Sequence, residues 1–297
     1  MHAVGNEVDV IPRFGVTIIP SASGRSDPVA DAKRAEELGF DLVAVWDHPH
    51  GEHPSFETWT FMTWLAANTT TIRIASNVLG MPFRLPALLA KMAESLDRLS
   101  GGRLILGLGA GGSDAELAGF GAPALPPDEK VDALEEAIDV IHGVWSEPAF
   151  TYDGAYYRNH EAMLEPKPAR PIPIWLGAYG PRMLKLTGRI ADGWIPSLGY
   201  LTAARVKPAM DQVRVAAEQA ERDPDALDYA CNVQVRVGGP PASDPDRRIA
   251  GEPGQVLEAL SSLIGLGFTV LNFMVGGRRD AQMELLATRV LPELRGR

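Results

Sequence analysis

Eight short apolar segments alternate along this chain with segments of helical periodicity. Most of these segments are continuously apolar, which is typical of parallel strands buried on both faces. Over 297 residues, this alternation predicts one α/β domain with the (β/α)8 TIM-barrel fold, spanning residues 1–297. The eight predicted strands are Phe14–Pro20, Asp41–Asp47, Ile72–Leu79, Arg103–Leu108, Ile172–Gly177, Gly193–Pro196, Asp228–Val237 and Phe268–Val275.

The segments between the predicted strands carry helix boundaries. Asp27-Pro28 provides an N-cap and a proline at the first helical position, and Gly39 suits the end of that helix. Pro86 starts a longer helix, which ends at Ser100 before two glycines. Further helices are predicted at about Val131–Trp145, Pro181–Arg189, Thr202–Arg222, Pro253–Leu266 and Asp280–Leu294.

Two segments interrupt the alternation. At about residues 146–171, tyrosines surround Asp153-Gly154 and prolines follow, which predicts an inserted hairpin with an Asp-Gly turn. We expect this hairpin to lie over a barrel end or to make a subunit contact. Gly238–Asp246 combines glycine and proline without periodicity, which predicts a mobile loop after the seventh strand.

The composition restricts partners and location. The formal net charge of −10 argues against nucleic-acid and anionic-membrane partners, because both call for a basic surface. Residues 1–13 lack the continuous apolar stretch of a signal peptide or membrane span. The single cysteine, Cys231, excludes an intrachain disulfide and is expected to be buried in a strand. We expect a cytoplasmic protein that forms a homodimer or a higher homo-oligomer.

Chemically reactive residues follow the C-terminal ends of the predicted strands. Asp47-His48 comes directly after the apolar run Leu42–Trp46, and a glycine-rich segment follows Leu104–Leu106. In a (β/α)8 barrel, the strand-to-helix loops at this end build the active site. The positions of these residues therefore predict an enzyme acting on a small molecule.

The glycine-rich segment has two interpretations. Gly107-x-Gly109-x-x-Gly112 has the spacing of a dinucleotide-binding fingerprint, and Glu129 lies at a suitable distance. That motif needs a helix directly after the glycines, whereas Ser113–Pro123 contains two more glycines and a proline and supports only a turn or two. We therefore favour a backbone that approaches a flat ligand closely over a Rossmann domain.

Three histidines, His48, His50 and His53, follow the second predicted strand. A His-x-His pair at a strand end suits a zinc hydrolase, but such a site also needs ligands from other strand ends. None of the other three histidines follows a predicted strand. We therefore predict no metal site and retain His48 as the functional candidate. Metal analysis of the purified protein would detect the metallohydrolase alternative.

The fifth predicted strand leads through a glycine turn into a helix. Gly177-Ala178-Tyr179-Gly180 precedes a proline at the helix start, where free N–H groups and the helix dipole favour a phosphate. Arg182 in the first turn adds a charge that suits an anionic ligand. The same pattern also fits an ordinary tight strand-to-helix turn, and shape alone favours that alternative.

An ordered series of short blocks resembles the luciferase-like monooxygenase superfamily, and within it the deazaflavin (coenzyme F420) dependent oxidoreductases. The series covers roughly residues 14–196 and is more specific than any one of its motifs. The matching blocks are Glu37–Asp41 with Asp47-His48, Ile72–Leu79, Phe83-Arg84 with Pro86, Leu96–Arg103, Leu106–Gly111, Pro173–Gly177 and Ala191–Trp194.

The resemblance implies a ring-shaped cofactor, coenzyme F420, at the C-terminal mouth of a luciferase-like barrel. It places Asp47 in contact with the ring and makes His48 the catalytic, proton-handling residue. It also predicts a non-prolyl cis peptide between Asn77 and Val78, at the back of the ring. The cofactor backbone contacts implied by the resemblance are Gly109, Ala110 and Gly111, and the implied phosphate contacts are Gly177, Ala178 and Gly180.

One departure from the related sugar-phosphate dehydrogenases is visible. Gly112 stands where that branch has a catalytic glutamate, and Glu116 lies nearby but out of register. A sugar-phosphate substrate is therefore not expected, and the sequence names no acid–base partner for His48.

The predicted function is hydride transfer between C5 of the deazaflavin and an unidentified small organic substrate. Reduced deazaflavin activates oxygen poorly, which favours hydride transfer over oxygenation. The alternatives are a flavin mononucleotide (FMN) dependent monooxygenase of the same fold and a deazaflavin-binding protein without catalysis, the second because of Gly112.

Overall fold

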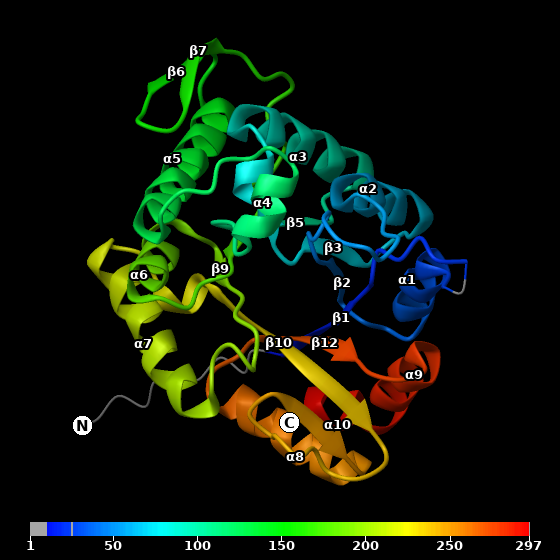
Figure 1. Cartoon of the computed structure of the whole chain (residues 1–297). Helices are drawn as coiled ribbons and strands as arrows, with labels where there is room; N and C mark the ends of the chain where they lie inside the picture. The colour runs from blue at the N-terminus through cyan, green and yellow to red at the C-terminus, as the bar shows by residue number, and fades with distance from the viewer. Residues whose placement is uncertain (1–10, 25, 297) are drawn as a thin grey trace, which may run out of the picture.

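A closed barrel of eight parallel strands occupies the centre of the computed structural model, which describes residues 11–24 and 26–296 (Figure 1). Strand β12 pairs with β1, and β9 pairs with β10, so the ring of hydrogen bonds is continuous. This confirms the predicted fold. In barrel order the strands are β1 (Arg13–Thr17), β2 (Leu42–Val45), β3 (Arg73–Ser76), β5 (Leu104–Gly109), β8 (Ile174–Leu176), β9 (Gly193–Trp194), β10 (Asp228–Val237) and β12 (Val270–Val275).

Helices surround the barrel, and α4 lies inside the ring formed by the outer helices (Figure 1). The barrel strands are buried between these helices and the barrel interior. Cys231 on β10 is fully buried, as predicted, and burial raises the pKa of its thiol to about 12. The helices are α1 (Pro28–Glu37), α2 (Thr58–Asn68), α3 (Pro86–Ser100), α4 (Asp114–Gly119), α5 (Pro127–Ser146), α6 (Pro181–Ile190), α7 (Ala203–Gln219), α8 (Pro253–Gly265), α9 (Arg279–Arg289) and α10 (Leu291–Arg295).

Helix α2 was not predicted because its sequence has almost no polar face. Trp59, Phe61, Met62 and Leu65 are all buried, and they lie on more than one side of the helix. An apolar sequence of this kind shows no amphipathic period. The last predicted helix is divided into α9 and α10, and Pro292 lies in the first turn of α10.

The third predicted strand, Ile72–Leu79, is interrupted. Strand β3 ends at Ser76, and a two-residue strand, β4 (Leu79–Gly80), then pairs with the end of β5. The Asn77–Val78 peptide between them is cis, which confirms the prediction made from the resemblance. The interruption lies at the C-terminal end of the barrel.

The segment after β10 contains a strand that was not predicted. Beyond the expected loop at 238–246, β11 (Arg248–Gly251) runs parallel to β10 on the outside of the barrel ring. Gln234 is paired with Arg248 in this ladder. Strand β11 therefore extends the wall of the barrel mouth on that side.

The inserted hairpin consists of β6 (Phe150–Asp153) and β7 (Arg158–Ala162), which are antiparallel. The Glu136 carboxylate of α5 accepts hydrogen bonds from the N–H groups of three turn residues, at 2.8–3.0 Å. The hairpin projects from the edge of the molecule beside α5 (Figure 1). It does not lie over a barrel end, so that expectation was wrong, and a subunit contact stays a prediction.

Candidate active site

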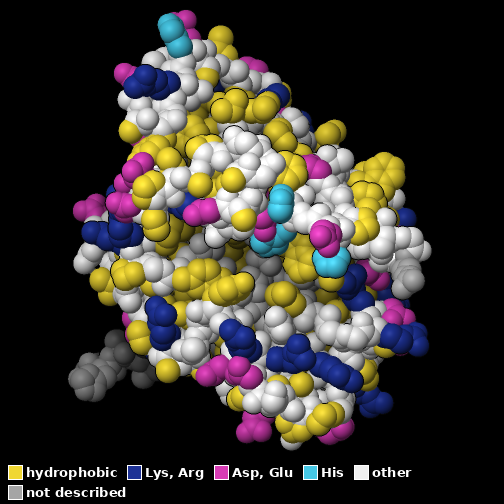
Figure 2. Space-filling model, in the orientation of Figure 1, with side chains coloured by type: hydrophobic (Ala, Val, Ile, Leu, Met, Phe, Trp, Pro, Cys, Tyr) yellow, Lys and Arg dark blue, Asp and Glu magenta, His cyan; other side chains and the backbone are white. Residues whose placement is uncertain are grey.

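The C-terminal ends of the barrel strands surround a cleft of about 650 Å³. This volume is typical of a pocket for a cofactor or a small molecule. His48, His50 and His53 all contribute to the lining, and histidine side chains are visible near the centre of this face in Figure 2. Other lining residues are Thr17, Ile19, Trp46, Asn77, Ser197, Tyr200 and Met274. The cleft lies where the sequence predicted an active site.

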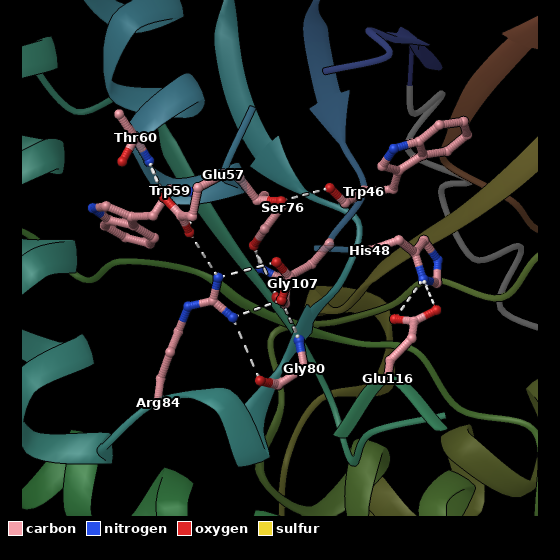
Figure 3. Close-up of polar contacts among 12 residues, drawn as sticks. Trp46, His48, Glu57, Trp59, Thr60, Ser76, Gly80, Arg84, Gly107 and Glu116 are labelled. Carbon is pink, nitrogen blue, oxygen red and sulfur yellow. Dashed lines mark hydrogen bonds and ion pairs between the residues drawn. The ribbon is translucent and has the colours of Figure 1, made fainter. Parts of the chain in front are cut away.

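His48 is paired with Glu116, which lies on α4. The distances from His48 Nδ1 to the two carboxylate oxygens are 3.0 and 3.1 Å, and Figure 3 shows the two side chains pointing toward each other. An ionised carboxylate only accepts hydrogen bonds, so His48 Nδ1 carries the proton and Nε2 is the nitrogen left to exchange one. Ser113 accepts a hydrogen bond from Glu116 N–H and caps α4. The sequence named no partner for His48, and the structure places Glu116 in that position.

Arg84 is the centre of an ionic cluster (Figure 3). Its guanidinium donates to both oxygens of Asp47, with Nη1–Oδ2 2.6 Å and Nη2–Oδ1 3.0 Å. Nη2 also donates to Glu57 at 3.2 Å, and Gly80 N–H donates to Asp47 Oδ2 at 2.8 Å. The Asp47 side chain is 1% exposed. Asp47 therefore holds the loop through Arg84 and Gly80, and its direct contact with a ring stays a prediction.

Glu57 also caps helix α2. Its carboxylate accepts hydrogen bonds from Trp59 N–H at 3.0 Å and from Thr60 N–H at 2.7 Å. Burial alone would raise the pKa of Glu57, but these N–H groups and the charge of Arg84 lower it below its ordinary value. Glu57 therefore links the start of α2 to the ionic cluster.

A network of amide side chains forms the floor of the cleft. Asn77 and Asn232 exchange two hydrogen bonds of 2.8 and 2.9 Å, and Asn232 Nδ2 also donates to Ser197 Oγ at 3.1 Å. Asn272 Nδ2 donates to Asn232 Oδ1 at 2.7 Å and to Thr17 Oγ1 at 2.9 Å. The network joins five separate parts of the barrel mouth, so the position of Asn77 is fixed by residues distant in sequence.

Val78 fills the space left by three glycines. A Cβ atom added at Gly109 would lie 2.8 Å from Val78 Cγ2, and one added at Gly177 would lie 3.2 Å from the same atom. A Cβ at Gly107 would lie 2.0 Å from the Ser76 carbonyl oxygen. These glycines therefore allow the Asn77–Val78 segment to approach, whereas the sequence interpretation assigned the glycine-rich segment to a ligand.

The remaining glycine-loop candidates lie beside a smaller cleft of about 310 Å³, which Ala110 lines. Gly111 has φ +89°, a conformation that favours glycine, and its carbonyl accepts a hydrogen bond from Lys130 Nζ at 3.0 Å. Nothing lies within 4 Å of a Cβ added at Gly112. Contacts of Gly109, Ala110 and Gly111 with a cofactor stay predictions.

Two of the predicted phosphate contacts belong to the barrel hydrogen bonding. Gly177 N–H donates to Leu108 O at 3.1 Å, and the carbonyl of the fully buried Ala178 accepts from the Trp194 indole at 2.9 Å. The Gly177 N–H is therefore already engaged, and Ala178 is buried.

Gly180 and Arg182 differ from this pair. Gly180 is the N-cap residue of α6 and provides no side-chain cap, and a Cβ added there would meet nothing within 4 Å. The Arg182 guanidinium is paired with Asp132 at 2.5 Å. The predicted phosphate site therefore depends mainly on Gly180 and the first turn of α6.

Within the described residues, no group of three or more histidine, cysteine or acidic side chains is placed to hold a metal ion. Of the helices that the structure describes, none is long and apolar enough to cross a membrane. The His50 and Phe120 rings are packed in a T-shaped arrangement, with centroids 6.3 Å apart.

A (β/α)8 barrel whose mouth holds a histidine–carboxylate pair above a polar floor is the architecture of a small-molecule enzyme. The chain belongs to the luciferase-like monooxygenase family, which it matches over residues 14–269.

The chain is also similar to named relatives, and it shares its fold with a solved structure. The chain is similar to an F420-dependent glucose-6-phosphate dehydrogenase from Intrasporangium calvum, with 28% identity covering 92% of this chain and 96% of the relative. It is also similar to a 5,10-methylenetetrahydromethanopterin reductase from Methanolobus tindarius, with 32% identity covering 82% and 74%. An F420-dependent secondary alcohol dehydrogenase, solved with an F420-acetone adduct, shares the fold with a TM-score of 0.84 and 19% identity, covering 95% and 99%.

Proposed function

We propose that the protein is an F420-dependent oxidoreductase that transfers a hydride between C5 of the deazaflavin and a small organic substrate. The observation that carries this proposal is the His48–Glu116 pair at the edge of the 650 Å³ cleft. The name of one relative supports the cofactor, because it is called F420-dependent, and the name of the other, a reductase, supports the reaction class.

The residues of the cleft fit a flat, partly polar ring. Trp46 and Met274 supply apolar lining, whereas Asn77 and Ser197 supply hydrogen-bonding groups. The Val78 side chain packs against the glycines behind it, so the Asn77–Val78 segment forms a firm back wall. A few polar groups in a mostly apolar pocket are the usual means of orienting a cofactor.

When bound, the deazaflavin supplies the hydride chemistry, and the protein supplies orientation and proton handling. His48 Nε2 donates a proton to the substrate, or accepts one from it, when the hydride is transferred. Glu116 holds the Nδ1–H tautomer and stabilises the imidazolium form, as a carboxylate behind a catalytic histidine does. We assign His48 as the catalytic residue and Glu116 as its positioning residue.

In this proposal the cofactor is contacted by residues at or after the ends of strands β3, β5 and β8. Asn77, Val78 and the Gly109–Gly111 backbone border the ring, and Gly180 with the first turn of α6 binds the phosphate. Asp47 shapes the ring edge through Gly80 and Arg84. Arg182 contributes once a ligand competes with Asp132 for its guanidinium.

The test is a parallel titration of the purified protein with F420 and with FMN, monitored by the absorbance and fluorescence of each cofactor. We expect tighter binding of F420. A loss of oxidised-deazaflavin absorbance under anaerobic conditions, on adding an alcohol, aldehyde or sugar-phosphate panel, would then identify the substrate. Glucose 6-phosphate is included in that panel, and the presence of Gly112 predicts poor turnover of it.

Other outcomes would redirect the assignment. Comparable or weaker affinity for F420, with turnover only in the presence of oxygen and a flavin reductase, would identify an FMN monooxygenase. Tight F420 binding without turnover across the panel would identify a binding protein.

The homo-oligomer and the cytoplasmic location stay predictions. Exposed apolar side chains on α2 and α3, Trp64, Leu88 and Leu99, provide an apolar surface that supports self-association. Light scattering coupled to size exclusion tests it.

A further inference from the structure

One face of the β10–β11 pair is polar and basic. Gln234 and Arg236 are two positions apart on β10, so their side chains lie on the same face of the sheet. Arg248 of β11 pairs with Gln234 in the ladder and shares that face. Val235 and Ile249, which point the other way, are buried. The alternation therefore directs two arginines to one side of the strand pair.

That face lines a second cleft, of about 320 Å³, whose lining includes Gln234, Arg236 and Arg248. Trp46 and Met274 line both this cleft and the 650 Å³ active-site cleft. The two spaces are therefore neighbours with a shared wall. A molecule that reaches His48 past Trp46 can extend toward the arginines.

The cations in this second cleft differ in their pairing. Arg279 is paired with Asp31 at 2.6 Å. Arg236 and Arg248 have neither a side-chain hydrogen bond nor an ion pair with any residue that the structure describes. No carboxylate is among the lining residues. In Figure 2, Lys and Arg side chains form a row along this side of the mouth.

This local charge is opposite to that of the whole chain, which carries a formal net charge of −10. Two guanidinium groups on neighbouring strands repel each other unless an anion lies between or beside them. Arginine presents a planar set of donors that matches carboxylate and phosphate oxygens. A cleft lined by one sign of charge also attracts such a ligand from solution.

We propose that Arg236 and Arg248 form an anion-binding subsite that holds a carboxylate or phosphate group of the substrate while its reacting carbon lies near His48. This rests on the proposed function, because it names the substrate class of the same site. Gln234 contributes a neutral hydrogen-bonding group between the two arginines, and Met274 borders the apolar part of the substrate.

The first test measures binding of inorganic phosphate and of succinate to the free protein by calorimetry. Arg236→Gln and Arg248→Gln should each weaken binding by about tenfold or more, because each removes a charge-assisted hydrogen bond. Arg278→Gln is the matched control, since it removes the same charge from a side chain that is 84% exposed and does not line the cleft. Arg248→Lys should give an intermediate loss, because lysine keeps the charge without the planar donor set.

The second test identifies which molecule carries the anion. The titrations are repeated with saturating F420, and F420 binding to each variant is compared with binding of the deazaflavin chromophore that lacks the phosphate and side chain. For a substrate subsite, phosphate still binds in the presence of F420, and the arginine variants bind both cofactor forms as the parent protein does.

Three results would overturn the proposal. One is equal phosphate and succinate binding by the parent protein and both arginine variants. Another is the absence of anion binding to the parent protein. The third is competition between phosphate and F420, with the variants losing affinity only for intact F420, because the anion would then belong to the cofactor. The first titration uses the free protein and needs neither turnover nor F420, so its result is independent of whether F420 is the cofactor.

Discussion

Arg84 and the pair Arg236 and Arg248 lie on different sides of the barrel mouth, and their surroundings differ. Arg84 donates to Asp47, Glu57 and the Gly80 carbonyl, and its side chain is 12% exposed. The arginines of β10 and β11 are exposed and have no counter-ion among the described residues. Arg84 on the first side is paired without a ligand, whereas Arg236 and Arg248 on the second side are not.

The comparison shows two different roles for arginine side chains. A largely buried arginine whose two terminal nitrogens both donate to neighbouring groups fixes the loops that carry the reactive groups, so the cost of desolvation has already been met during folding. An exposed arginine without a partner contributes little to stability and remains able to bind an anion. The side of the mouth that holds Arg84 (the paired side) should therefore govern folding and the geometry of the site. The side that holds Arg236 and Arg248 (the unpaired side) should govern substrate choice.

The largest expected effect concerns the reactive group on the paired side. His48→Ala should lower the turnover number by about 10²–10⁴-fold, because it removes the proton-exchanging group. The dissociation constant of F420 should change little. Steady-state kinetics and cofactor titration measure the two quantities separately.

Glu116→Gln provides the companion measurement. It keeps a side chain of similar shape beside His48 Nδ1 but removes the charge, so a loss of turnover smaller than that of His48→Ala is expected. If both variants retained the parent's turnover, His48 would be a contact residue only.

The second effect compares the two kinds of arginine directly. Arg84→Met leaves the buried Asp47 carboxylate without its bidentate partner and should lower the free energy of unfolding by about 3–5 kcal/mol. Arg236→Met, made on the exposed face of β10, should change it by no more than about 0.5 kcal/mol. Urea denaturation measures both, and similar losses would remove the distinction drawn between the two sides.

The third effect concerns the phosphate contact. Gly180→Val places a side chain in open space at the start of α6, so it should weaken F420 binding by about tenfold with little change in stability. Gly177→Val is the contrasting variant, because its side chain would press against Val78 and should lower the melting temperature. Unchanged F420 affinity in Gly180→Val would return this turn to a purely structural role.

The smallest expected effect is a pH dependence on the paired side. The pKa of Glu57 is lower in the folded protein than its ordinary value of 4.5. Its stabilising contribution is therefore present above pH 4.5 and is lost as the pH falls through the folded-state pKa. Glu57→Gln should cost about 1 kcal/mol at neutral pH, the usual worth of a helix N-cap.

The corresponding measurement follows the unfolding free energy from neutral pH to about pH 3 for both proteins. The difference between them should shrink on the acid side. A constant difference over the whole range would show that the Glu57 charge makes no contribution.

The sequence determined those features that depend on neighbours along the chain. Continuous apolar runs between helical patterns were enough for the barrel, and the position of Asp47-His48 at a strand end pointed to the cleft that is the candidate active site. The cis peptide at Asn77–Val78 came from the resemblance alone, since no local pattern predicts such a bond. Helix α2 escaped prediction because an apolar helix has no amphipathic period.

Tertiary structure decided which side chains meet. Glu116 lies 68 positions from His48 and contacts it only because α4 turns back over the mouth, and Asn77 and Asn232 are 155 positions apart. The lack of a counter-ion at Arg236 and Arg248 likewise depends on where every described carboxylate lies. Local periodicity specifies the direction of a side chain within its own helix or strand. Charge pairing depends on distances through space, which only the closed barrel fixes.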